Sequence, residues 1–223
     1  IVSDKKNIYN NNLLPKFNED RINSINFNHD LLNLHKKNFL LGKVLNYIHK
    51  DSIVVDVGAN KGLYSAAFAE KAKIVYAFEV SDPVLVQLMQ TASKFKNIKI
   101  IKKAVNDKTN NSSFFIDENR FSNSGLVKQV KGPVKQVKCI KLDDYFLKKN
   151  IRIDFVKIDT EGTEINVLRG MSNLIDKFRP HIMVECWGKQ SAYNHAEMYS
   201  FFGNRNYYCY INLQACGMVN LKD

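Results

Sequence analysis

Two hydrophobic patterns alternate along most of this chain. Short apolar runs rich in β-branched residues are typical of buried strands, and stretches with apolar residues three or four positions apart are typical of helices. The apolar runs predict strands at residues 53–57, 74–78, 98–101, 153–158 and 181–186. The amphipathic stretches predict helices at about residues 61–71, 82–95, 142–149, 164–169 and 196–202. Strands and helices that alternate in this way form an α/β fold, a parallel sheet joined by right-handed crossovers.

The alternation is interrupted in the middle of the chain and again at its end. Between residues 106 and 140, two short strands at 113–116 and 134–140 predict a hairpin inserted over the rim of the sheet. Such insertions often carry substrate contacts, although a plain surface hairpin has the same pattern. Residues 207–212 and 216–221 predict a closing antiparallel hairpin.

The first fifty residues differ from the rest. Residues 1–28 are polar and rich in asparagine, whereas residues 29–49 have the spacing of one or two amphipathic helices. We therefore expect an N-terminal arm and helical cap over residues 1–50. A single cofactor-binding domain is expected over residues 51–223, because no repeat or linker divides that part of the chain.

The turn after the first predicted strand carries a chemical signal. It reads D-x-G-x-N-x-G, with Asp56, Gly58, Asn60 and Gly62 between a buried strand and a helix start. Glycine allows a positive φ and leaves room for a ligand, and the helix start presents free N–H groups. The next strand ends in Glu79, where an acid can bind both hydroxyls of a ribose. These features are typical of a nucleotide-type cofactor site.

This turn has three interpretations. A dinucleotide site needs G-x-G-x-x-G, but Asn60 stands where the middle glycine would lie and would crowd a pyrophosphate. Asp56, two residues before the first glycine, suits a zwitterionic ligand, which favours S-adenosylmethionine (SAM) over a nicotinamide cofactor. The third interpretation, a strand–helix turn that needs glycine only for its geometry, is less favoured because Glu79 is also present.

Composition limits the class of protein. The chain has 223 residues, 45% of them hydrophobic, and no run approaches the ~20 apolar residues of a membrane span. Its four cysteines form no C-x-x-C pair and no zinc-spaced cluster, so we expect a reducing, cytoplasmic setting. The net charge of +11 fits an anionic partner. Lysines spread over solvated faces explain it better, because the sequence has no basic–aromatic cluster.

Several motifs between residues 50 and 187 carry a family resemblance. They are D-V-G-A-N-K-G (56–62), Y-A-F-E (76–79), K-L-D-D (141–144), D-F-V-K-I-D-T-E-G-T-E (154–164), V-L-R-G (167–170) and R-P-H-I-M-V-E (179–185). In this order they resemble the FkbM family of SAM-dependent methyltransferases. The resemblance implies a class I methyltransferase fold, with a Rossmann-like, seven-stranded, mostly parallel sheet, helices on both faces and a C-terminal antiparallel hairpin. It also implies O-methylation of a sugar, a glycan or a small natural product.

The resemblance assigns a set of cofactor-binding residues. By position, the methionine part of SAM would be lined by Asp56, Gly58, Asn60 and Gly62. Glu79 would hold the ribose, and Asn106 and Asp107 would flank the adenine. Val80 belongs to the same set, although the family usually has a proline directly after the acid and this chain has its next proline at Pro83.

Carboxylates at the ends of parallel strands are the candidates for catalysis, because ligands of open α/β sheets bind there. Methyl transfer to oxygen needs an aligned acceptor and a base for the hydroxyl proton. Asp159 is the leading candidate for the base or for an acceptor-orienting group, with Glu161 and Glu185 in support. Alternatively, Asp159 and Glu185 bind Mg²⁺. A structural alternative has Glu161 or Glu164 capping the next helix and Glu185 paired with Arg179 or a lysine.

Two other classes of function stay open. A nucleic-acid methyltransferase would fit the positive charge, but the loop at residues 159–161 lacks the N-P-P-Y-like segment used for exocyclic amines. A non-catalytic SAM-binding protein would keep the fold and lose transfer. Trp187 and Tyr193 either stack on a sugar ring or belong to the core. We expect a small-molecule or glycan acceptor, and we disfavour a nucleic acid.

Overall fold

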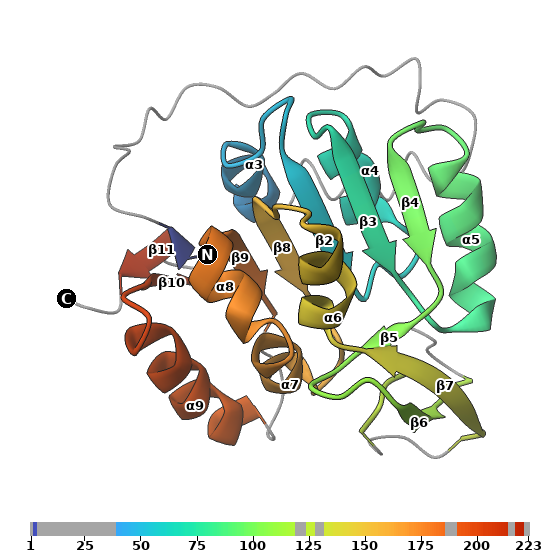
Figure 1. Cartoon of the computed structure of the whole chain (residues 1–223). Helices are drawn as coiled ribbons and strands as arrows, with labels where there is room; N and C mark the ends of the chain where they lie inside the picture. The colour runs from blue at the N-terminus through green and yellow to red at the C-terminus, as the bar shows by residue number, and fades with distance from the viewer. Residues whose placement is uncertain are drawn as a thin grey trace.

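A parallel β-sheet forms the centre of the molecule (Figure 1). The computed structural model describes residues 2–3, 39–118, 124–127, 132–185, 191–213 and 217–220. Five strands run parallel in the order β9-β8-β2-β3-β4. They are β2 (Ile53–Val57), β3 (Ile74–Phe78), β4 (Ile98–Ile101), β8 (Phe155–Ile158) and β9 (His181–Val184). The five strands predicted from the apolar runs are therefore confirmed.

The register brings the carboxyl ends of these strands to one edge of the sheet. Val57, at the end of β2, pairs with Phe78 of β3 and with Ile158 of β8. Ile158 in turn pairs with Val184 of β9. The loops that follow β2, β3, β8 and β9 therefore meet at the edge where open α/β sheets bind their ligands.

The sheet has eight strands in the described part of the chain, rather than the seven expected. The additional strand, β1 (Val2–Ser3), pairs antiparallel with β9 and with β10 (Tyr208–Leu213). It lies opposite Ile182 and Cys209, between the parallel strands and the last strands of the chain. β10 pairs antiparallel with β11 (Gly217–Asn220). A two-residue strand is too short to give a hydrophobic pattern, so the sequence does not predict β1.

A second, three-stranded sheet lies beside the carboxyl ends of the parallel strands (Figure 1). In it, β5 (Ala104–Val105) pairs parallel with β7 (Val134–Ile140), and β7 pairs antiparallel with β6 (Asn111–Phe115). The pairing of β6 with β7 confirms the predicted inserted hairpin. Its apolar side chains pack against Val80, in the loop that follows β3. The insertion is thus fixed next to the edge where the loops meet.

Helices cover both faces of the central sheet (Figure 1). The helices on one face are α3 (Phe39–Leu45), α4 (Leu63–Ala69) and α5 (Asp82–Ala92). Those on the other face are α6 (Leu142–Phe146), which continues into the 3-10 helix η2 (Leu147–Lys149), α7 (Glu164–Arg169), α8 (Ser172–Phe178) and α9 (Ser191–Gly203). Side chains alternate between the two faces: Val54 packs with Phe68 of α4, and Val55 packs with Phe146 of α6.

The sequence pattern does not predict α8. Its N-terminus is capped by Asp143, which lies about thirty positions earlier in the chain. Asp143 Oδ1 accepts the N–H of Leu174 at 2.9 Å, and Oδ2 accepts the N–H of Asn173 at 3.2 Å. Capping is usually recognised from a residue directly before the helix, so a cap this distant gives no local signal.

Some of the predicted features fall outside the described residues. Most of the N-terminal arm, residues 4–38, does so, as do Trp187 and the side chain of Tyr193. Of the expected helical cap, α3 is described, and it packs in the same core as α4. Among the helices within the described ranges, none combines the length and apolar character needed to cross a membrane.

Candidate functional site

A pocket opens at the carboxyl ends of β2, β3 and β8, beside the small sheet. Its wall is formed by the turn after β2, the loop after β3, strands β5 and β6, and the loop after β8. The predicted site residues that reach this wall are Gly58, Asn60, Glu79, Val80, Asp159 and Glu161. The fold therefore brings together three segments that carry predicted site residues: the turn after β2, the end of β3 with the loop after it, and the loop after β8.

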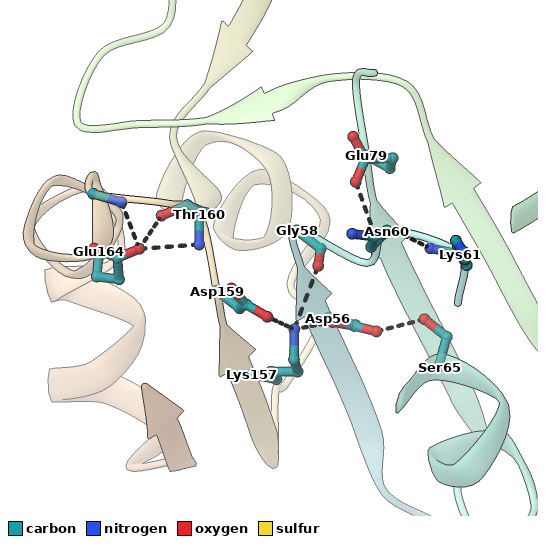
Figure 2. Close-up of polar contacts among 11 residues, drawn as sticks. Asp56, Gly58, Asn60, Lys61, Ser65, Glu79, Lys157, Asp159, Thr160 and Glu164 are labelled. Atoms are coloured by element: carbon teal, nitrogen blue, oxygen red, sulfur yellow. Dashed lines mark hydrogen bonds and ion pairs between the residues drawn. The ribbon is translucent and has the colours of Figure 1, made fainter. Parts of the chain in front are cut away.

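The turn after β2 comes very close to the loop after β8. Gly58 has a φ of +72°, and a Cβ atom at this position would lie 1.7 Å from the carbonyl oxygen of Asp159. Only glycine fits both this conformation and this contact. Asn60 has a φ of +50°, and its Oδ1 accepts the N–H of Lys61 at 2.8 Å (Figure 2). Asn60 thus adopts the left-handed conformation that asparagine tolerates.

Glu79 connects this turn to the loop after β3. Its Oε2 accepts the N–H of Asn60 at 2.9 Å, and its Oε1 accepts those of Val80 and Ser81 at 2.7 and 2.8 Å. Burial raises the pKa of the Glu79 carboxyl. The three backbone N–H groups oppose this shift, and the charge of Asp56 adds to it. The carboxyl is held in place and keeps acceptor capacity for a ligand.

Asp56 and Gly62, the first and last residues of the D-x-G-x-N-x-G segment, do not form part of the pocket wall. Asp56 is fully buried; its Oδ2 accepts the hydroxyl of Ser65 at 2.6 Å, and its Oδ1 lies 3.4 Å from Lys157 Nζ. Gly62 has a φ of +85°, and a Cβ atom there would lie 2.6 Å from Leu88 Cδ1. Gly62 is therefore required where α4 packs against α5, and the charge of Asp56 is paired within the protein.

Lys157 is a site residue that the sequence analysis missed. Its Nζ contacts Asp56, Asp159 and the carbonyl oxygen of Gly58 (Figure 2). The ring centroid of Tyr64 lies 5.0 Å from Nζ. Although burial favours the neutral amine, the two carboxylates raise the pKa of Lys157, so the side chain is a cation. The feature of the sequence that could have identified Lys157 is that a charged residue stands inside the otherwise apolar run F-V-K-I.

Asp159, Glu161 and Glu185 come together at the ends of β8 and β9. The carboxyl groups of Asp159 and Glu185 share a hydrogen bond. Burial, this hydrogen bond and the charge of Asp159 raise the pKa of Glu185 to about 8, with a smaller effect from Glu161. Burial opposes ionisation of Asp159, but Lys157 and the hydrogen bond hold the pKa of Asp159 below its usual value. At neutral pH Glu185 therefore donates the shared proton to an ionised Asp159.

Glu164 holds the loop between β8 and α7. Its Oε1 accepts the N–H of Thr160 at 3.0 Å, the hydroxyl of Thr160 at 3.1 Å and the N–H of Gly162 at 3.0 Å (Figure 2). Glu161, inside this loop, has a φ of +55°, a conformation that costs non-glycine residues about 1–3 kcal/mol. Glu164 therefore shapes the loop, while Glu161 reaches the pocket wall.

Asn106 and Asp107 do not line the pocket, although the preceding residue, Val105, does. Asn106 Oδ1 accepts the N–H of Asp107 at 2.9 Å. The backbone of Asn106 packs against Gly170: a Cβ atom added to Gly170 would lie 2.3 Å from the carbonyl oxygen of Asn106. The apolar part of the wall is formed by other residues, Val80, Ala104, Phe114 and Leu126. The sequence does not show this wall because it depends on the pairing within the small sheet.

Comparison with known protein families agrees with this architecture. The family described as the methyltransferase FkbM domain matches residues 56–209. The chain belongs to the FkbM methyltransferase family. No match was found among curated proteins.

Solved structures resemble this FkbM domain at low sequence identity. Methyltransferase FkbM from Methylobacillus flagellatus KT is 14% identical, with a TM-score of 0.53; the alignment covers 82% of this chain and 47% of that one. This chain thus spans about half the length of that protein. An rRNA methylase from Streptococcus thermophilus is 16% identical (TM-score 0.46; 77% and 81% covered). Precorrin 8w decarboxylase from Methanobacterium thermoautotrophicum is 13% identical (TM-score 0.48; 82% and 83% covered). The first of these shows the α/β methyltransferase fold.

The acidic groups of this FkbM domain give no support to a bound Mg²⁺. Within the described residues, no three His, Cys, Asp or Glu side chains are arranged to hold a metal ion. Asp159 and Glu185, the ligands of the alternative interpretation, are not part of any such group. The alternative pairing of Glu185 with Arg179 is not seen, because Arg179 donates to the carbonyl oxygens of Arg205 and Asn206.

Proposed function

We propose that this FkbM domain is a SAM-dependent O-methyltransferase acting on a hydroxyl of a sugar, a glycan or a small natural product. The observation that carries the proposal is that the glycine turn, Glu79 and Asp159 line one pocket. A cofactor bound by the turn and Glu79 would lie next to a carboxylate that can take the proton of a hydroxyl. Family membership supports methyl transfer as the reaction.

The pocket has features that suit the different parts of SAM. Three backbone N–H groups bind the Glu79 carboxyl, which leaves Oε2 with an acceptor site for a ribose hydroxyl. The wall of Val80, Ala104 and Phe114 suits the apolar faces of an adenine. Gly58 has no side chain, so the methionine part can approach the backbone there. When bound, SAM supplies the activated methyl group, and the protein supplies position and electrostatics.

The carboxyl groups would handle the proton of the acceptor. Methylation of a hydroxyl releases this proton, and Asp159 is the carboxylate on the pocket wall that can accept it. Glu185 shares its hydrogen bond with Asp159, so the two act as one proton-binding pair. Glu161 also reaches the wall, where it can orient an acceptor through a second hydroxyl.

Calorimetry with SAM and with NAD tests the cofactor. We expect micromolar binding of SAM, weaker by about tenfold or more in Glu79→Ala, and no binding of NAD. Asp176→Ala removes an exposed ion pair with Arg205 and should bind SAM as the unmodified protein does. If the unmodified protein binds no SAM, the proposal fails and a non-catalytic role becomes the better explanation.

The acceptor can be identified by mass spectrometry. The protein would be incubated with SAM and a panel of sugars, glycans, hydroxylated natural products and RNA, with Mg²⁺ or with a chelator. We expect a methyl group to be added to a hydroxyl compound in both conditions. Methylation of RNA alone would replace the proposed acceptor class, and transfer only with Mg²⁺ would assign the carboxylates to a metal.

A further inference from the structure

A cation is buried directly behind the carboxylates of the pocket. Lys157 Nζ lies 3.1 Å from Asp159 Oδ2, 3.4 Å from Asp56 Oδ1 and 3.3 Å from the carbonyl oxygen of Gly58 (Figure 2). Its side chain is 4% exposed, and that of Asp56 is 0% exposed. Transfer of a proton to Asp159 does not by itself require such a lysine, so its presence needs a separate explanation.

The sheet fixes this lysine in place. Asp56 and Lys157 are register partners in the neighbouring strands β2 and β8, and Lys157 also pairs with Met183 of β9. Register determines the face of the sheet on which a side chain lies, so Lys157 and Asp56 share one face. Burial and the contacts of Nζ with Asp56 and Asp159 then hold the ammonium group between these two carboxylates.

The charges around Glu185 are mostly negative. Among the described residues, the charged groups that act on it are Lys157 from β8, and Asp159 and Glu161 from the loop after β8. Two of these three are carboxyl groups, and neighbouring negative charges oppose the loss of a proton from a third carboxyl. Lys157 is the member of this set that favours the ionised form.

We propose that Lys157 is a positioning residue for the methyl transfer: its ammonium group allows the Asp159–Glu185 pair to release the shared proton near neutral pH. This inference rests on the proposed function, because it concerns the pair that would receive the proton of the acceptor. With the shared proton present, the pair is a poor base; once it has left, the pair can accept a proton from a hydroxyl.

The working pH of the pair agrees with this role. The raised pKa of Glu185, about 8, places the loss of the shared proton slightly above neutral pH. A base is most effective when the pKa of its conjugate acid is near the working pH. Without the positive charge of Lys157, the pair would keep its proton to a higher pH, and a smaller fraction of it could act as a base under the same conditions.

NMR titration of protein labelled with ¹³C in its side-chain carboxyl groups tests the proposal. The key variant is Lys157→Met combined with Asp56→Asn, which removes the ammonium together with its buried partner and so leaves no unpaired buried charge. We expect the Glu185 midpoint near 8 in the unmodified protein and higher by about one pH unit or more in the double variant.

Two further variants serve as controls. Lys157→Arg keeps the positive charge and should leave the Glu185 midpoint close to that of the unmodified protein. Lys177→Met makes the same chemical change at an exposed lysine of α8 and should not move it. A folded double variant whose Glu185 titrates at the unmodified midpoint would contradict the proposal.

If the double variant does not fold, a ¹⁵N NMR titration of the unmodified protein tests the proposal. The ¹⁵N signal of the Lys157 side chain should be that of an ammonium group from about pH 6 to about pH 10. It should also shift at the pH where Glu185 loses its proton. A neutral amine at pH 7, or a signal insensitive to Glu185, would show that the two groups are not coupled.

Activity gives a further readout once the acceptor is known. In the double variant, kcat at pH 8 should fall about tenfold and recover at higher pH. A loss that no pH restores would assign Lys157 a purely structural role. If the carboxyl groups titrate as expected but no methyl group is transferred, the proposed function is wrong although the electrostatic coupling is present.

Discussion

Gly58 is the residue at which the turn after β2 contacts the loop after β8. In Gly58→Ala, the new Cβ would lie 1.7 Å from the carbonyl oxygen of Asp159, at a φ of +72°. We expect the free energy of unfolding to fall by about 3 kcal/mol or more, and SAM binding to be lost. Urea denaturation and calorimetry would measure both effects.

Gly203→Ala is the matched control for this change, because a Cβ atom at Gly203 meets no other atom within 4 Å. Gly203 ends α9, where alanine is tolerated, so we expect a change within about 1 kcal/mol and unaltered SAM binding. If Gly58→Ala and Gly203→Ala lowered the free energy of unfolding by the same amount, the contact between Gly58 and Asp159 would not contribute to stability.

Glu164 is the second residue with a clear mutational consequence. Glu164→Ala removes the acceptor of the three hydrogen bonds from Thr160 and Gly162. We expect a loss of about 1–3 kcal/mol in unfolding free energy. Methyl transfer should fall more than SAM binding, because Glu161 loses its fixed position.

The control for this variant is Glu197→Ala, which removes an exposed ion pair with Arg169. An exposed pair contributes about 0–1 kcal/mol, so stability and transfer should change little. If Glu164→Ala lowers SAM affinity as much as it lowers the transfer rate, then the loop supports the cofactor and not the acceptor.

Single residues also show how far sequence reasoning reaches. Gly58, Asn60 and Glu79 were predicted from a local pattern, because strand, turn and acid follow one another in the chain. The environment of Asp56 was not predictable in that way. Whether its carboxylate faces a ligand depends on Lys157, which comes from a strand about a hundred positions later. The roles of the predicted cofactor and catalytic residues stay predictions until binding and transfer are measured.

At the scale of elements, α8 depends on a distant cap. Asp143→Ala removes the acceptor for the N–H groups of Asn173 and Leu174 and for the side-chain amide of Asn173. We expect the unfolding free energy to fall by about 1–2 kcal/mol, as for loss of an N-cap. The neighbouring variant Asp144→Ala, which loses only an exposed hydrogen bond with Thr109, should cost less. An equal fall in unfolding free energy in Asp143→Ala and Asp144→Ala would contradict the role of Asp143 as the cap of α8.

The elements that the sequence predicts share one property: their signal is local. β2 and α7 each have a continuous pattern and a glycine at or after one end, and the structure places them within two residues of the expected bounds. β1, α8 and the apolar pocket wall depend on partners far along the chain. Hydrophobic periodicity in one segment carries no information about such partners.

At the scale of the whole molecule, the raised pKa of Glu185 makes stability depend on pH. Its pKa is about 8 in the folded protein and about 4.5 when unperturbed, so the folded state holds a proton that the unfolded state releases between these values. The free energy of unfolding should therefore fall as the pH rises from about 4.5 to about 8, and then level off. Urea denaturation across this range would measure the slope.

Glu185→Gln should reduce this pH dependence, since the amide does not titrate. It should not abolish it, because burial also raises the pKa of Glu79, which contributes in the same direction. Glu197→Gln, at an exposed position, should keep the full slope. An unchanged slope in Glu185→Gln would show that Glu185 is not protonated in the folded protein at neutral pH.

The pairing of β2 with β8 has a consequence for how the protein is made. The loop that closes the pocket against the glycine turn is synthesised about a hundred residues after that turn. At about 5–20 residues per second, this interval lasts roughly 5–20 seconds. During that time the growing chain carries an apolar strand with one long edge uncovered and has no complete cofactor pocket. A ligand of this pocket therefore cannot stabilise the growing chain before β8 has emerged, and during that interval the uncovered strand edge is open to wrong pairing.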